Sequence, residues 1–168
     1  MKLTATLLAV STLTAQQLPP ADRQIARDIF QQLIETNTTD SVGSVTAAAQ
    51  AMRQRLLTAG FAADDLKILG PNDRKMNLVA RYHGKPGSTL KPILVICHLD
   101  VVEAKREDWT TDPFKFVEKD GYFYGRGTED IKQADAGLVT AFIRMKREGY
   151  VPSRDIVLAL TADEEGGK

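Results

Sequence analysis

The sequence lacks the features that would point to disulfides, to nucleic acid or to a membrane span. Cys97 is the single cysteine in 168 residues, so no internal disulfide can form, and its apolar neighbours predict a buried, inert thiol. Lys plus Arg and Asp plus Glu each number 22, and a formal net charge of zero gives no reason to expect nucleic acid or an anionic membrane as a partner. No apolar stretch is long enough to cross a bilayer. The 43% hydrophobic and 26% charged residues are typical of one globular domain.

The first 15 residues differ in character from the rest of the chain. One positive charge at Lys2 precedes a short apolar run that ends at the small residue Ala15. This arrangement predicts a secretory signal peptide over 1–15, with a mature domain over 16–168 that is periplasmic or extracellular. The alternative is a short buried helix or strand, in which case the protein would be cytoplasmic.

Helical and strand patterns alternate along the remaining chain. Apolar residues at helical spacing predict three helices, and short apolar or alternating runs predict strands. The predicted helices cover 22–35, 44–58 and 131–148, the predicted strands cover 67–69, 77–82, 92–97 and 156–160, and a hairpin covers 114–124. This order predicts an α/β fold with a mixed sheet sandwiched by helices.

Two of the predicted strands, 92–97 and 156–160, are apolar throughout. Such runs are typical of strands that are covered on both faces. Since no further connection follows 156–160, we expect an open sheet edge beside that strand.

Residues that can bind metal stand at the ends of these strands. His98 directly follows one buried strand, and Glu164 and Glu165 follow the other. Asp130 lies at the start of the third helix, after a Gly-Arg-Gly turn. Since ligands of open α/β sheets gather at the carboxyl ends of the strands, we expect these four side chains to converge.

The residue types fit a hydrolytic zinc site. Asp100 stands two residues after His98, where a carboxylate can fix the histidine tautomer and strengthen it as a ligand. Of the adjacent Glu164 and Glu165, one can bind metal while the other accepts a proton from water, whose pKa zinc lowers to about 7.

Three motifs in order resemble one known family. They are His98-Leu99-Asp100-Val101-Val102, the segment from Trp109 to Lys132 that includes Gly125-Arg126-Gly127-Thr128-Glu129-Asp130, and Thr161-Ala162-Asp163-Glu164-Glu165-Gly166-Gly167. The sequence is similar to the co-catalytic zinc hydrolases, which include aminoacylases, acetylornithine deacetylases, succinyl-diaminopimelate desuccinylases, carboxypeptidases and dipeptidases. The resemblance covers most of the chain after the predicted signal and implies the N-terminal portion of a zinc-peptidase-like catalytic domain.

The resemblance implies a role for each candidate residue. His98 would bind one metal, Asp130 would bridge two, and Glu165 would bind the second. Glu164 would be the general base, and Asp100 would orient His98. The implied cofactors are two Zn²⁺ ions, with Co²⁺ or Mn²⁺ possible because mixed nitrogen and oxygen donors accept all three.

The same resemblance sets expectations for the whole protein. Its substrates would be small peptides or N-acyl amino acids, and its full-length form would be a homodimer. Relatives use a further Asp and a further His downstream as ligands, so we expect the 168-residue chain by itself to be inactive or nearly so.

Two other functions stay open at this point. The chain could be an inactive fragment or pseudoenzyme that binds only a metal or a partner along its open edge. It could also be an α/β binding domain without metal, which requires all three motifs to be coincidental and His98 to be a structural histidine.

Overall fold

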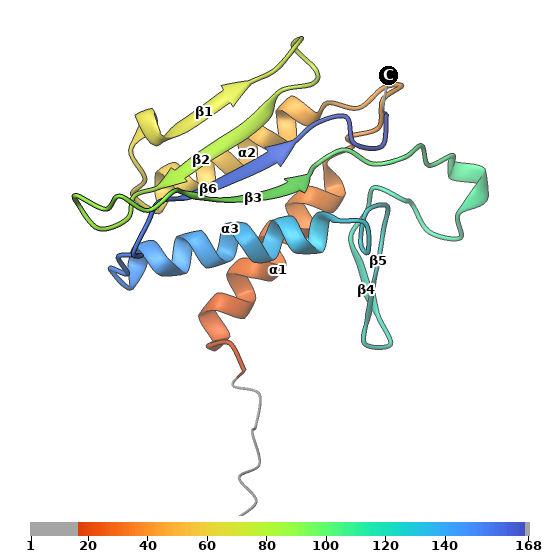
Figure 1. Ribbon diagram of the computed structural model, residues 1–168. Helices are drawn as coiled ribbons and strands as arrows, with labels where there is room; N and C mark the ends of the chain where they lie inside the picture. Colours follow the sequence, from red (N-terminus) through yellow and green to blue (C-terminus); the bar gives the residue numbers. More distant parts are fainter. Residues whose placement is uncertain (1–16, 167–168) are drawn as a thin grey trace, which may run out of the picture.

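The computed structural model describes residues 17–166 of the chain (Figure 1). The predicted signal peptide, 1–15, lies outside the described residues and stays a prediction. The helices are α1 (Pro20–Glu35), α2 (Val45–Thr58) and α3 (Lys132–Arg147). The strands are β1 (Leu66–Leu69), β2 (Asn77–Tyr82), β3 (Ile93–His98), β4 (Val117–Lys119), β5 (Tyr122–Tyr124) and β6 (Ile156–Thr161). Every helix and strand that the sequence predicts is therefore present.

The main sheet is mixed and has four strands in the order β1-β2-β6-β3. β2 pairs antiparallel with both β1 and β6, while β3 pairs parallel with β6. β4 and β5 form the separate predicted hairpin. Figure 1 shows β6 inside the sheet, between β2 and β3. The expected open edge beside 156–160 is therefore wrong, and β3 is the edge strand on that side.

The core lies on one face of this sheet. Strand residues that alternate toward this face are buried, among them Leu78, Ala80, Leu158 and Leu160. They form one cluster with side chains from all three helices: Ile29 and Leu33 of α1, Ala48 and Met52 of α2, and Val139 and Phe142 of α3. The sheet is mixed as predicted, and the three described helices cover one of its two faces.

The opposite face of the sheet exposes apolar side chains. On β3, Leu94 is 59% exposed and Ile96 is 62% exposed, and on β1 Leu69 is 56% exposed. The expectation that residues 92–97 form a strand covered on both faces is therefore wrong. Both faces of this strand are apolar, but among the described residues only the face with Val95 and Cys97 is packed against other side chains of the core.

Local signals position the helix ends. The Ser44 hydroxyl accepts a hydrogen bond from the Ala47 backbone nitrogen at 3.3 Å, which satisfies one free donor of the first turn of α2. After α2, Gly60 has a φ of 92°, the left-handed conformation in which glycine commonly ends a helix. α1 begins at Pro20, where a missing N–H costs no helical hydrogen bond. Among the described residues, no helix has the length and apolar character needed to cross a membrane.

A buried carboxylate links the first and third helices. Asp22, in the first turn of α1, is 1% exposed, and its oxygens lie 2.8 and 3.1 Å from the two terminal nitrogens of Arg147 at the end of α3. Arg144 lies 3.8 Å away. The hydrogen bond from Arg147 and the charges of both arginines outweigh burial and lower the pKa of Asp22 below its usual value.

This pair predicts a pH-dependent contribution to stability. Because the pKa of Asp22 is lower in the folded state than in the unfolded state, its contribution is complete above the unfolded value, about 3.8, and disappears as pH falls through the folded value. Urea unfolding should show Asp22→Asn less stable than the parent at pH 7, with a difference that shrinks below pH ~3.8. Exposed Asp28→Asn is the control. A difference that stayed constant down to pH ~2 would contradict this prediction.

Candidate metal centre

The register of the sheet brings the candidate residues together. His98 is paired with Thr161 across the parallel β3–β6 ladder, and the Leu99 backbone nitrogen extends the ladder by donating to the Thr161 carbonyl at 2.8 Å. Both strands therefore end at the same level. Glu164 and Glu165 follow Thr161 in a turn, which places them beside His98 as the sequence predicts.

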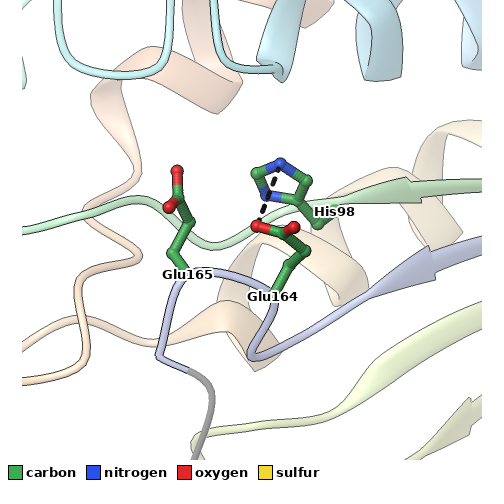
Figure 2. Close-up of side chains that lie close together, drawn as sticks. All are labelled: His98, Glu164 and Glu165. Carbon is green, nitrogen blue, oxygen red and sulfur yellow. Dashed lines mark ion pairs between the residues drawn. The ribbon is translucent and has the colours of Figure 1, made fainter.

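Three of the predicted residues form a compact group of metal-binding atoms. One ligand atom each of His98, Glu164 and Glu165 lies within 4.8 Å of the other two. The Glu164 carboxylate is 3.9 Å from His98 Nε2. Figure 2 shows the His98 ring and the Glu164 carboxylate facing each other, with the Glu165 carboxylate beside them. Among residues 17–166, no other group of three histidine, cysteine or carboxylate side chains meets this distance criterion.

Asp130 reaches the same histidine from the start of α3. Its Oδ1 lies 3.1 Å from His98 Nε2, and its side chain is 70% exposed. The turn before it needs glycine: Gly127 has a φ of 85°, and an added Cβ would lie 2.9 Å from Val101. The peptide bond between Asp130 and Ile131 is cis. The structure thus places Asp130 against His98, outside the three-residue group.

The hydrogen bonds of His98 fix the direction of its two nitrogens. Nδ1 lies 3.1 Å from the Asp100 carbonyl oxygen, which can only accept, so Nδ1 carries the proton. Nε2 is then left to face Asp130 and Glu164. Burial acts to lower the pKa of His98, but the hydrogen bonds with the Asp100 carbonyl and the Asp130 side chain and the charges of Asp100 and Glu164 outweigh it and raise the pKa.

Asp100 makes a contact that its sequence position does not reveal. Its carboxylate is 3.6 Å from His98 Nδ1, beyond ordinary hydrogen-bond distance. Its other oxygen accepts a hydrogen bond from the Glu165 backbone nitrogen at 2.8 Å. Asp100 therefore contacts the histidine through its backbone carbonyl and the glutamate turn through its side chain, and links the ends of β3 and β6.

The donor set fits a divalent metal ion. One imidazole nitrogen and several carboxylate oxygens are donors that zinc accepts, and cobalt and manganese accept them too. Burial and the nearby charge of Asp130 raise the pKa of Glu165, since its ionised form lies among other carboxylates. A bound cation would relieve this repulsion, so the residues present are suited to one.

Some residues of the site give no clear signal in the sequence. Ala162 at the start of the glutamate turn donates its backbone N–H to the Asn77 side chain at 2.8 Å. Lys75 contacts Asp163 at 2.6 Å. These partners lie 85 and 88 residues apart, so no local spacing could have indicated them.

The fold and the donor set together define an α/β domain with a candidate metal centre at the carboxyl ends of two neighbouring strands. Sequence comparison makes the assignment specific: residues 94–168 match the Peptidase family M20/M25/M40. Over these residues the chain matches a family of hydrolytic metallopeptidases and amidohydrolases. The family resemblance and the mixed α/β fold predicted from the sequence are thereby confirmed.

Curated relatives extend the match toward the N-terminus. The chain is 36% identical over 142 residues to succinyl-diaminopimelate desuccinylase of Delftia acidovorans, which covers 82% of this chain and 35% of that protein. The chain spans about a quarter to a third of the length of the curated relatives that it matches.

Solved structures share the fold. A dipeptidase from Saccharomyces cerevisiae superposes with a TM-score of 0.72 at 24% identity, covering 88% of this chain and 33% of that one. A dinuclear metal binding peptidase of the M20 family from Bacillus subtilis superposes with a TM-score of 0.61 at 16% identity, covering 88% and 37%. At these identities the superpositions establish the fold alone.

Proposed function

We propose that this chain forms part of a zinc-dependent hydrolase that cleaves peptide or amide bonds of small peptides or N-acyl amino acids. The observation that carries the proposal is the convergence of His98, Glu164 and Glu165 within 4.8 Å from the ends of two neighbouring strands. The desuccinylase among the relatives and the dipeptidase among the fold neighbours support an amide or peptide substrate.

In this proposal each donor has a separate task. His98 binds metal through Nε2, since Nδ1 donates to the Asp100 carbonyl. Glu165 is the second ligand, because its backbone nitrogen is held by Asp100 and its position is therefore fixed. Asp130, whose carboxylate faces Nε2, would be the ligand common to the two metal ions that the family resemblance implies. When bound, zinc supplies Lewis-acid chemistry: it makes water more acidic and polarises the substrate carbonyl.

Glu164 is the proposed general base. Its side chain is 63% exposed, so its carboxylate can reach a water and a substrate above the strand ends. The carboxylate accepts the proton that the attacking water loses, and then donates it to the leaving amine nitrogen as the amide C–N bond breaks. The products are a carboxylate and a free amine.

A protein of the family's full length that carries this sequence provides the test. Its hydrolysis of dipeptides, N-succinyl and N-acetyl amino acids should depend on added zinc, disappear after chelation and return on zinc addition. A zinc-loaded protein with no turnover on any of these substrates would favour the alternative, a metal-binding domain without activity.

The isolated 168-residue chain should have little activity. The resemblance implies five protein ligands, and this sequence provides three of them in His98, Asp130 and Glu165. Turnover within about tenfold of a full-length relative would contradict this expectation.

The dual contact of Asp100 predicts an intermediate effect on metal binding. In Asp100→Asn, the side-chain oxygen can still accept the hydrogen bond from the Glu165 nitrogen, but the NH₂ group then points toward His98 Nδ1. Because both of these groups are donors, the NH₂ group cannot stabilise the ring. Changes in groups that orient metal ligands typically cost about 10- to 100-fold in affinity. Zinc affinity by chelator competition should fall by this amount, with measurable zinc retained.

His98→Ala is the comparison for Asp100→Asn, because it removes a proposed ligand and should nearly abolish zinc binding. If Asp100→Asn lost zinc as completely as His98→Ala, Asp100 would have to be a ligand itself. An unchanged affinity would mean that His98 is oriented by another group.

A further inference from the structure

The turn that carries the two glutamates is held by a lysine from a distant loop. Lys75, between β1 and β2, places Nζ 2.6 Å from Asp163 Oδ1 and 2.7 Å from Asp40 Oδ1. The Lys75 side chain is 26% exposed and that of Asp163 is 30% exposed, so the pair is shielded from much of the solvent. Ion pairs with restricted access to water are screened less than fully exposed pairs.

The loop that presents Lys75 is locally well fixed. The Asn72 side chain accepts hydrogen bonds from the backbone nitrogens of Arg74 and Lys75 at 3.0 and 3.1 Å. Arg74 in turn donates to the Gly43 carbonyl at 2.7 and 2.9 Å and to the Asp40 carbonyl at 2.7 Å. Two adjacent cations thus connect three loops, with Lys75 directed to the turn after β6.

The Asp163 end of the contact belongs to an unusual backbone. Asp163 has a φ of 74°, a left-handed conformation that Asp and Asn tolerate better than most residues. Its Oδ1 also lies so close to Gly166 that a Cβ there would be 2.3 Å away. The side chain of Asp163 therefore fills the inside of the turn, and Lys75 holds that side chain from outside.

We propose that Lys75 is a positioning residue for the metal site: by pairing with Asp163, it holds the turn in the conformation that directs Glu164 and Glu165 toward His98. This inference rests on the proposed function, because it assumes that the glutamates face a bound divalent cation. The three anchors of the turn are then Asn77 at its start, Lys75 at Asp163, and Asp100 at Glu165.

Metal affinity provides a readout that does not require turnover. Co²⁺ binding to a protein of the family's full length that carries this sequence would be followed by calorimetry and by the visible absorption of bound Co²⁺, which reports coordination geometry. Lys75→Met removes the charge, and Asp163→Asn removes the partner while keeping a residue that tolerates the left-handed conformation. Each should weaken Co²⁺ binding about tenfold and change the absorption spectrum.

Further variants separate positioning from general damage. Lys75→Arg keeps a cation and should restore most of the affinity. The double variant Lys75→Met/Asp163→Asn should be no weaker than either single variant, because both remove the same contact. Lys67→Met is the matched control, since Lys67 pairs with Asp64 at 3.4 Å on an exposed surface and should leave the affinity unchanged.

The outcomes separate the two proposals. If the parent full-length protein binds no Co²⁺, the proposed metal function fails, and the positioning role fails with it. If the parent binds Co²⁺ and both Lys75→Met and Asp163→Asn bind within twofold of it, the positioning role alone is overturned. Loss of cooperative urea unfolding in both single variants would also overturn it, because Lys75 would then support the fold and not the turn.

Discussion

Replacing Glu164 by glutamine in a full-length protein with this sequence is expected to lower kcat by about 10²- to 10⁴-fold, the usual contribution of a positioned general base. Glutamine keeps the size of the side chain and its hydrogen-bonding oxygen, but it cannot take a proton from water. Because Glu164 is proposed to bind no metal, zinc content by elemental analysis should stay at the parental value. The measurement is kcat on the best substrate beside zinc stoichiometry.

The neighbouring glutamate gives the matched comparison. Glu165→Ala removes a proposed ligand, so it should lose zinc as well as activity. If Glu164→Gln emptied the site while Glu165→Ala left zinc in place, the two roles would be reversed. Glu164 is exposed whereas Glu165 is half-buried, and the Glu165 nitrogen donates to Asp100; these differences support the assignment that the family resemblance implies.

Lys132→Met should cause a large loss of stability. Lys132 is fully buried, and its Nζ donates to the carbonyl of Leu33 at 2.8 Å and that of Thr36 at 2.9 Å, at the end of α1. Burial lowers the pKa of Lys132, and the charges of Asp135 and Asp100 partly oppose this effect. Methionine fills similar space but leaves the carbonyls and the buried Asp135 without that cation.

The expected loss is about 3–5 kcal/mol in the free energy of unfolding, because the two carbonyls each lose a charged donor, at a cost of about 1–3 kcal/mol or more apiece. A domain of this kind has about 5–15 kcal/mol in total, so the urea midpoint should fall markedly. Lys119→Met, on the exposed β4–β5 hairpin, should change the free energy by less than about 0.5 kcal/mol. A Lys132→Met midpoint equal to that of this control would contradict the prediction.

Local patterns explain which parts of the fold could be predicted. The apolar spacing of α1, α2 and α3 and the short runs of the strands depend on neighbours in sequence, so their existence could be inferred directly. The strand order could not, because nothing within 156–160 states that β2 and β3 will flank it. The exposure of Leu94 and Ile96 was missed for a similar reason, since an apolar run has the same sequence whether or not a layer covers it.

The candidate site shows the same division. His98, Glu164 and Glu165 could be placed together because each follows a strand, and parallel strands end at one edge. The side-chain contact of Asp100 with the Glu165 nitrogen depends on how the turn bends, which the sequence does not state. Lys75 could not be identified, because its partner Asp163 is 88 residues away and lysine on a loop is ordinarily solvated.

The central place of β6 has a consequence for how the protein is made. β6 is the last strand of the described chain, yet it lies between β2 and β3, which do not pair with each other. During synthesis, β2 and β3 therefore leave the ribosome before β6. The edges of β2 and β3 that pair with β6 stay unpaired until β6 has been made. His98 and the two glutamates meet only when β6 inserts. Metal binding by these three residues would therefore have to follow the insertion of β6.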